Sequence, residues 1–378
     1  MKLKEFARIN MGQSPKGETY NTNGNGMPFL QGRKTFGRIY PTIDTWTTNP
    51  IKIANKNEIL MSVRAPVGDM NFANQQICIG RGLCSINAKN GRNKYLYYML
   101  LNSMNNLKQK STGTVFDSIN RNDLENLEID FHSEENQEKI ENILGNIDSK
   151  IELNNEINNN LHDLAEQQFN EIYSIGSPKK LDELLFNVST GSRPKGGAQE
   201  SGIPSIGAEK IEKFGIYDYS SEKYISEDYY EKLKNGKLNS GDVLLYKDGA
   251  YTGKVSMCLN GFPHNKAAVN EHVFILNTEN NWAQNYLYFV LYNKDNKEML
   301  HRLASSKAAQ PGLNQVELKS IEINICDKKD ILKFENNVKP IMEKIALNSL
   351  ENKKLAELRD TLLPKLMNGE IDLDNIEI

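Results

Sequence analysis

The sequence is poor in cysteine and has no long apolar run. Its four cysteines are scattered without a Cys-x-x-Cys pair, which argues against a disulfide framework or a structural zinc site and favours reduced thiols. No stretch approaches the roughly 18 apolar residues that a membrane span needs. The first residues, MKLKEFARINMGQ, contain no apolar core of a secretory signal. We therefore expect a cytoplasmic protein with no membrane partner.

Motifs for catalysis are also missing. The five histidines show no metal-ligand spacing on a predicted helix, and neither a GxGxxG fingerprint nor an (N/D)PP(Y/F) motif for a flipped adenine occurs. GAYTGKV (Gly249–Val255) is one residue shorter than a P-loop and lacks its Ser/Thr. These absences predict a chain that is not an enzyme, with no catalytic residue, metal site or cofactor of its own.

The charge is divided unevenly along the chain. The net charge of −3 hides a first segment, residues 1–122, with 17 Lys and Arg against 6 Asp and Glu, and a second, residues 123–173, with 2 against 14. A basic segment beside an acidic one suggests different partners for each, with a polyanion for the first. Segregation of charge with helix composition alone would give the same pattern.

The sequence repeats itself. Five motifs of the first half recur in the same order in the second half: GQSPKG as GSRPKG, MPFLQG as IPSIGA, NEILMSVRAPVG as GDVLLYKDGAYTG, KYLYYMLL as NYLYFVLY, and GTVFDSINRNDLENLEI as AAQPGLNQVELKSIEI. One match could arise by chance, whereas five in order predict two copies of one domain.

Each copy combines strands and helices. Short β-type runs such as EILMSV and DVLLY come first, and an aromatic run typical of a helix follows (Tyr95–Leu101; Tyr286–Tyr292). A loop then leads to a short strand that ends at Ile129 or Ile325. We predict an α+β fold with two pseudo-symmetric domains, each followed by a helical segment. The predicted boundaries are 1–132 for the first domain, 133–175 for its helix, 176–327 for the second domain, and 328–378 for the second helix and tail.

The two helical segments run from about Glu134 to Tyr173 and from about Lys329 to Met367. Apolar residues recur at two heptad positions in each, a pattern typical of coiled coils. In the first segment, one predicted seam is Ile140, Ile147, Asn154 and Leu161, and the other is Ile143, Lys150, Ile157 and Leu164. In the second segment, one seam is Phe334, Ile341, Asn348, Leu355 and Leu362, and the other is Val338, Ile345 and Asn352. We expect an antiparallel pair, although two separate amphipathic helices remain an alternative. A helix of about 38 residues spans roughly 57 Å, or about 17 base pairs, which suits two DNA half-sites.

This arrangement resembles the DNA-specificity subunits of type I restriction–modification systems over the whole chain. LRDTLLPKLMNGEI (Leu358–Ile371) is similar to a C-terminal signature of that family, and GQSPKG and GSRPKG resemble loops near the start of its target-recognition domains. NRNDLENLEI and NQVELKSIEI resemble the segments that lead into its spacer helices. The first helix ends in QQFNEIYS instead of a second copy of the signature.

The resemblance implies a non-catalytic subunit that reads a bipartite site in double-stranded DNA, one half for each domain. It also implies that the helices form a platform for two copies of a methyltransferase subunit, which restriction subunits then join. S-adenosylmethionine, ATP and magnesium would belong to those partners.

Candidate DNA contacts are basic or amide side chains beside loops, because Arg and Lys suit guanine and phosphate while Asn and Gln suit adenine. For any one of them, a solvated surface charge is the alternative. The candidates are Lys16, Arg33, Lys34, Arg38, Arg64, Arg81 and Asn120 in the first domain, and Arg193, Lys195, Lys210, Lys247, Lys254, Lys266, Gln310 and Asn314 in the second.

Two other classes of function remain open. A coiled-coil scaffold with duplicated heads would have no affinity for DNA, and the basic first segment disfavours it. A recognition part of a single-chain methyltransferase–nuclease would need several hundred further residues.

Overall fold

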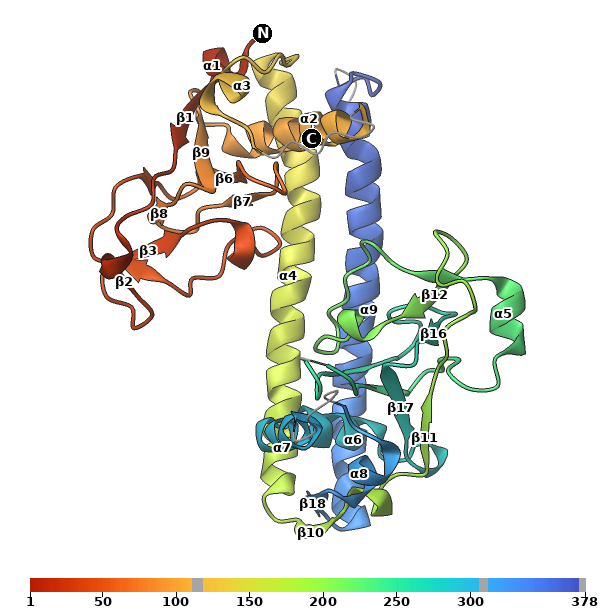
Figure 1. Cartoon of the computed structure of the whole chain (residues 1–378). Coiled ribbons are helices and arrows are strands. Elements are labelled where there is room, and N and C mark those ends of the chain that lie inside the picture. The colour runs from red at the N-terminus through yellow and green to blue at the C-terminus, as the bar shows by residue number, and fades with distance from the viewer. Residues whose placement is uncertain (111–117, 250, 306–311, 374–378) are drawn as a thin grey trace. The chain divides into compact units, whose positions relative to one another are not determined.

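The computed structural model describes residues 1–110, 118–249, 251–305 and 312–373. The chain divides into two compact units, unit 1 (Met1–Asp148 with Glu357–Ile378) and unit 2 (Ser149–Ala356). Helices α4 (Glu134–Tyr173) and α9 (Lys328–Met367) each contribute residues to both units (Figure 1). They occupy almost the same residues that the heptad pattern predicts. Each compact unit includes part of both helices. The predicted division, which sets the two helices apart from the two domains, stays a prediction.

Unit 1 is built on an antiparallel sheet in the order β1-β9-β6-β7. Its strands are β1 (Ala7–Met11), β9 (Leu83–Ala88), β6 (Ile59–Ser62) and β7 (Met70–Phe72). All four residues of β6 are buried, as expected for a central strand. A mixed sheet in the order β2-β4-β3-β8-β5 accompanies it, with strands β2 (Tyr20–Asn21), β4 (Trp46–Thr47), β3 (Met27–Leu30), β8 (Ile77–Ile79) and β5 (Ile53–Ala54).

The helices of unit 1 close its main core. The aromatic run predicted to be helical lies in α2 (Asn93–Lys110), where Tyr95 and Leu96 are fully buried against the sheet. Ile140 of α4 and Leu366 of α9 belong to the same core. Two short helices complete the unit: α1 (Leu3–Phe6) and α3 (Arg121–Glu125). The strand predicted to end at Ile129 is reduced to an isolated bridge between Lys2 and Glu128.

Unit 2 repeats the main sheet with the order β11-β17-β14-β15. Its strands are β11 (Asn187–Thr190), β17 (Val273–Asn277), β14 (Val243–Tyr246) and β15 (Val255–Met257). A second sheet, β13-β12-β16, joins β13 (Tyr224–Ile225), β12 (Ile203–Ile206) and β16 (Ala268–Val269), with β12 and β16 parallel as β3 and β8 are in unit 1. The recurrence of one topology agrees with the repeated motifs.

The helices of unit 2 are α5 (Glu227–Lys232), α6 (Gln284–Tyr292), α7 (Lys294–Ser305) and α8 (Gln315–Ser320). The strand predicted to end at Ile325 is present as β18 (Glu322–Ile325), and it pairs with β10 (Ser177–Lys180). Aromatic side chains of α6 fill the core, where Phe289 stacks against Phe169 of α4.

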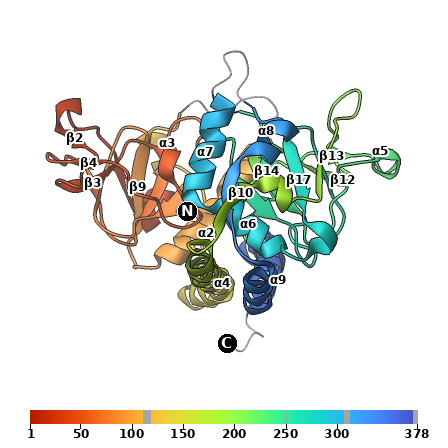
Figure 2. The ribbon, with the colours of Figure 1, turned by 90° about the horizontal axis from the view of Figure 1, so that it is seen from below.

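Within unit 2, α4 and α9 lie side by side and antiparallel, and Figure 2 views this pair end-on. Asn154 Nδ2 donates to Asn352 Oδ1 at 2.9 Å, whereas Asn158, further along α4, accepts from Asn348, which lies earlier in α9. In α9 the predicted seams are confirmed only in part: Phe334, Val338, Ile345 and Asn348 are buried, whereas Ile341, Asn352, Leu355 and Leu362 are half-buried and Met342 and Leu363 are buried in their place. One predicted seam of α4 is wrong, because the side chains of Lys150 and Leu164 are largely exposed.

The correct second seam of α4 lies one residue later. It consists of Leu144, Ile151, Asn158 and Ala165, all of which are buried. The shift arises because Leu144 lies four residues after Ile140, and the later buried residues Ile151, Asn154, Asn158, His162 and Ala165 follow one another at steps of three or four. An apolar residue stands at both candidate positions near the start of the helix, Ile143 and Leu144, so the sequence alone did not separate the two seams.

Candidate nucleic-acid interface

Three loops of unit 1 that the sequence singled out meet at the edge of the sheet. The loop after β1 contacts the turn between β8 and β9, where Gln13 N–H donates to Ile79 O at 2.9 Å. A Cβ atom at Gly12 would lie 2.2 Å from Gly80 O, so only glycine allows this approach. Gly82 N–H in turn donates to Gln31 O at 3.2 Å. The three segments that carry Lys16, Arg33–Lys34 and Arg81 are therefore packed together.

Most cations on these loops are exposed. Within the described residues, Lys34, Arg64 and Arg81 make no ion pair, and all three side chains face solvent. Lys16 is exposed and lies 4.0 Å from Glu18, a separation that gives little attraction in water. Unpaired, solvated cations are the groups that can release counterions on binding a polyanion.

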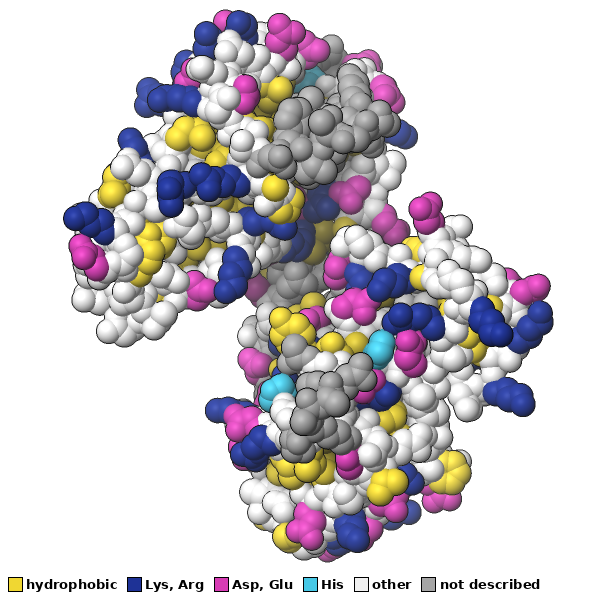
Figure 3. All heavy atoms as spheres, viewed as in Figure 1, with side chains coloured by type: hydrophobic (Ala, Val, Ile, Leu, Met, Phe, Trp, Pro, Cys, Tyr) yellow, Lys and Arg dark blue, Asp and Glu magenta, His cyan; other side chains and the backbone are white. Residues whose placement is uncertain are grey.

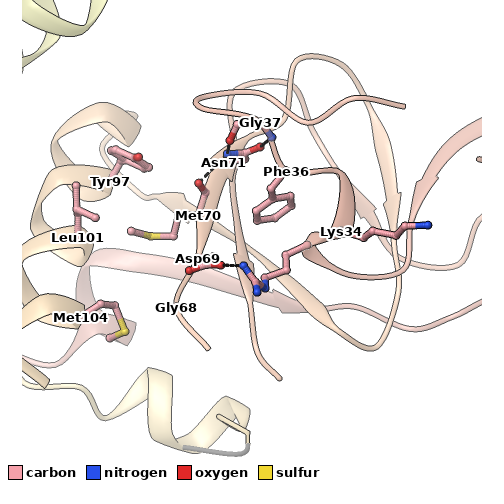
Figure 4. Close-up of a pocket in the computed structure, with 11 residues that line it drawn as sticks. Lys34, Phe36, Gly37, Gly68, Asp69, Met70, Asn71, Tyr97, Leu101 and Met104 are labelled. Carbon is pink, nitrogen blue, oxygen red and sulfur yellow. Dashed lines mark hydrogen bonds and ion pairs between the residues drawn. The ribbon is translucent and has the colours of Figure 1, made fainter. Parts of the chain in front are cut away.

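Arg33 is one of the residues that line a cavity of about 500 Å³ in unit 1. It forms an ion pair with Asp69, which follows the turn after β6. The loop itself is fixed by Asn71, whose Nδ2 donates to Gly37 O at 2.9 Å and whose Oδ1 accepts from Gly37 N–H at 3.0 Å. Figure 4 shows Phe36 between the Asn71–Gly37 pair and Asp69. Tyr97, Leu101 and Met104 of α2 lie on the opposite side of the cavity.

Arg38 has a structural partner that the sequence did not indicate. Its Nη2 lies 2.9 Å from Asp148 of α4, which also accepts from Tyr98 at 2.7 Å and from Arg359 Nη1 at 2.9 Å. Burial and the nearby carboxylate raise the pKa of Tyr98 well above its ordinary value, so the phenol remains a donor. The geometry makes Arg38 an anchor of its loop, and the proposed DNA surface does not include it.

In unit 2 the loop after β11, which begins at Gly191, also packs closely against a neighbouring backbone segment. A Cβ atom at Gly191 would lie 1.7 Å from Val269 O, which reproduces the close approach at Gly12. Arg193 Nε lies 3.0 Å from Glu271 Oε1, so this predicted DNA contact is already paired with a carboxylate. Lys195, in the turn that follows, is exposed.

Several other predicted cations of unit 2 have acidic or carbonyl partners. The side chain of Lys210 is only 10% exposed and bonds to the carbonyl groups of Asp218 and Ser220 and to the Asp218 carboxylate. Lys247 pairs with Asp248 at 2.8 Å. Two more are also paired: Lys254 with Glu212, and Lys266 with Glu227 and Glu231. On the face shown in Figure 3, Lys and Arg alternate with Asp and Glu over unit 2, whereas unit 1 shows patches of Lys and Arg.

The predicted amide contacts have a local role. Asn120 caps α3 by accepting from Asp123 N–H at 3.1 Å, and Asn314 caps α8 by accepting from Glu317 N–H at 2.9 Å. In each case the acidic side chain bonds back to the asparagine backbone, which completes a capping box. Gln310 lies outside the described residues.

Sequence reasoning missed the basic side of α7. Lys294, Lys297 and Arg302 line one groove together with the turn that follows β14. The signal was present in KDNKEMLHRL, where basic residues recur at helical spacing while Asn296 and Leu300 are buried. The helix prediction rested on the aromatic run and covered residues 286–292 only, so α7 was not predicted.

One cluster on α4 combines a histidine with two carboxylates. Side-chain atoms of His162, Asp163 and Glu166 lie within 4.8 Å of one another. Burial, with Lys213 nearby, lowers the pKa of His162 to about 3, so its ring is neutral, and its Nε2 lies 2.9 Å from Tyr288 Oη. We interpret His162 as a packing residue. Within the described chain, no helix is both long enough and apolar enough to cross a membrane, and all four cysteines are free and buried.

Comparison with known proteins finds relatives of one class. The family model described as "Type I restriction modification DNA specificity domain" matches residues 1–163. The chain is 26% identical to the MjaIX specificity subunit of Methanocaldococcus jannaschii, over 99% of this chain and 94% of that one. It is 40% identical to a protein of the same organism assigned provisionally as the MjaX specificity subunit. That match covers 40% of this chain and 36% of the relative.

The fold has a solved counterpart. The crystal structure of the S subunit of a type I restriction–modification system from M. genitalium matches with a TM-score of 0.57 over 97% of this chain and 95% of that one, at 18% identity. At this identity the likeness establishes the α+β fold. Together, these comparisons show that residues 1–163 match a type I restriction modification DNA specificity domain, and that the chain is similar over nearly its full length to a type I specificity subunit.

Proposed function

We propose that the chain reads a bipartite site in double-stranded DNA, with unit 1 recognising one short sequence and unit 2 the other. The observation that carries this proposal is the repeated sheet, β1-β9-β6-β7 and β11-β17-β14-β15, flanked in each unit by a glycine-held loop with exposed cations. Lys16, Arg33, Lys34, Arg64 and Arg81 are the proposed contacts of unit 1. Phosphate contacts position a protein on DNA and base contacts select the sequence, so we expect both kinds within this set.

The long helices have a proposed role in assembly. Helices α4 and α9 form an antiparallel coiled coil in this proposal, and they relate the two recognition domains by pseudo-symmetry. Two methyltransferase subunits bind to this platform, and restriction subunits join the complex. S-adenosylmethionine, ATP and magnesium are bound by those partners, and this chain supplies no catalytic group. The complex acts on chromosomal and foreign DNA, so its place is the cytoplasm.

A map of methylated adenines tests this function. Methylation is compared between the native strain and a strain that lacks this gene alone. We expect the deletion to remove one split motif, two short sequences around a fixed gap, and leave every other motif intact. Restored methylation after complementation is the control. An unchanged map, with the methyltransferase gene expressed, would contradict the proposal and favour a scaffold without DNA specificity.

A further inference from the structure

Helix α7 and the turn after β14 enclose a basic groove in unit 2. Its volume is about 490 Å³. The groove is lined by Tyr251, Thr252, Lys254, Lys294, Lys297, Glu298, His301 and Arg302. Four of these side chains are cationic and one is a carboxylate, so the lining has a strong positive excess.

The sequence of α7 creates this basic side. Asn293 caps the helix, because its Oδ1 accepts from the N–H groups of Asp295 and Asn296 at 3.1 and 3.3 Å. The buried Asn296 side chain donates to Tyr173 Oη and to Val290 O, both at 2.8 Å. These bonds fix the rotation of the helix, and Lys294 and Arg302 are therefore exposed on the side away from the core.

The opposite wall of the groove is a tightly held turn. Thr252 Oγ1 donates to Gly249 O at 2.7 Å, and Gly253 N–H donates to Tyr246 O at 2.9 Å. Gly253 has a φ of +98°, and a Cβ atom there would lie 3.3 Å from Lys297 O, so the turn packs directly on α7. This arrangement leaves the ring of Tyr251 at the tip of the turn, 64% exposed.

The cations of α7 are not neutralised within the unit. Lys254 is paired with Glu212, but Lys294, Lys297 and Arg302 make no ion pair among the described residues. Lys294 and Arg302 are eight residues apart, or about 12 Å along the helix. This span covers about three successive phosphates of one DNA strand, at roughly 3.4 Å of rise each. A row of cations suits a phosphate backbone better than a single phosphate group.

Unit 1 has a cavity between the elements that correspond to the two walls of the α7 groove. That cavity lies between the turn after β6, with Gly68 and Asp69, and the helix α2 that follows the main sheet. In unit 2 the turn after β14 and the helix α7 enclose the basic groove. The same position is therefore open in both copies of the domain, although the residues that line it differ.

We infer that the α7 groove is a binding site for the DNA sugar–phosphate backbone, in which Lys294, Lys297 and Arg302 contact consecutive phosphates and Tyr251 packs against the adjoining nucleotide. This inference rests on the proposed function, because it assumes that unit 2 lies on DNA. Backbone contacts of this kind raise affinity for all sequences equally, and Arg193, Lys195 and other loop residues are left to select the sequence.

The test uses the full chain in complex with its methyltransferase subunit. Binding to a duplex with the recognition motif and to a scrambled duplex is measured between about 50 and 200 mM salt. We expect Lys294→Ala/Lys297→Ala/Arg302→Ala to weaken binding to both duplexes by roughly 10-fold to 100-fold at low salt. The slope of log K against log salt should fall by up to about 2.7, since each phosphate contact contributes about 0.9. Tyr251→Ala should weaken both duplexes severalfold.

Lys232→Ala/Lys234→Ala is the matched control. Both lysines are exposed in the same unit, within α5 or just after it, and their removal should leave the salt slope unchanged. An intact complex with unaltered affinity and slope in the α7 variant would overturn the inference but not the proposed function. Loss of the methyltransferase subunit from the α7 variant would also overturn it, and would make the groove a protein-docking site. If the wild-type complex itself had no affinity for DNA, that result would instead contradict the proposed function.

Discussion

At the scale of single residues, Glu335 couples the stability of unit 2 to pH. Its carboxylate accepts from Tyr286 N–H and from Asn285 Nδ2, each at 2.7 Å. Burial raises the pKa of Glu335 to about 7 from an ordinary value of 4.5. Between about pH 4.5 and 7 the folded protein therefore holds a proton that the unfolded chain has released. The stabilisation is complete below about pH 4.5 and is lost as the pH rises through 7.

We predict that Glu335→Gln stabilises unit 2 at pH 8 by about 1 kcal/mol. The amide carries no charge to desolvate, and its Oε1 can still accept from Tyr286 N–H. Its Nε2 can donate to Asn285 Oδ1, which is buried without a partner, once the Asn285 amide is turned over. The measurement is thermal unfolding of the complex at pH 4 and pH 8. At pH 4 the wild-type carboxyl is largely protonated in both the folded and the unfolded chain, so the two proteins should unfold at nearly the same temperature. An equal shift at both pH values would contradict the linkage.

Residue roles could be predicted from the sequence only in part. The repeated motifs GQSPKG and GSRPKG singled out the loops at Gly12 and Gly191, and the structure shows the close backbone approach at both. Asn120 and Asn314 were ambiguous, because an asparagine suits both an adenine contact and a helix cap. The spacing Asn-x-x-Asp and Asn-x-x-Glu favours the cap, and the structure has that arrangement. The partners of Arg38 and Lys210 come from distant segments, and one sequence does not reveal such pairings.

At the scale of elements, buried asparagines fix the register of α4 against α9 in unit 2. Asn158 Oδ1 accepts from Asn348 Nδ2 at 2.9 Å, and its own amide donates to Ser349 Oγ at 3.1 Å. Asn158 and Asn348 are 7% and 2% exposed. A polar pair within an apolar seam specifies one alignment, since a shifted register would bury these amides without partners.

We predict that Asn158→Leu destabilises unit 2 by about 1–3 kcal/mol, because it leaves the Asn348 amide buried and unpaired. The double variant Asn158→Leu/Asn348→Leu should recover most of this loss, since neither amide then needs a partner. Thermal unfolding of the two variants measures both effects. Asn160→Ala, on the exposed side of α4, is the control and should change little. A double variant no more stable than the single one would contradict the pairing.

At the scale of the whole molecule, the repeat predicts two independent readers. We expect that replacing residues 1–130 by the equivalent part of a relative changes one half of the methylated motif and leaves the other half and the gap intact. The physical reason is that the main core of unit 1 is formed by residues of its own sheet, of α2 and of its own parts of the long helices. Methylation mapping of the chimaera measures the outcome, and a change in both halves would mean that recognition is not divided between the units.

The gap between half-sites should depend on the long helices, since α4 and α9 run through both units without interruption. We predict that one extra heptad in each helix, inserted near Asn155 and Asn352, lengthens the gap by about 3 base pairs. Seven residues add about 10.5 Å of helix, and each base pair occupies about 3.4 Å. A whole heptad preserves the seam, so the pairing of the helices is retained.

The half-site sequences themselves should not change in this variant, because every loop of the recognition domains is untouched. An insertion of the same length between Lys234 and Asn235, both exposed in unit 2, is the control and should leave the gap as it is. Methylated-adenine mapping reads gap and half-sites in one experiment. New half-sites with an unchanged gap would show that the helices hold the domains in their reading conformation without setting the distance between them. A longer gap with the old half-sites would assign that distance to the helices.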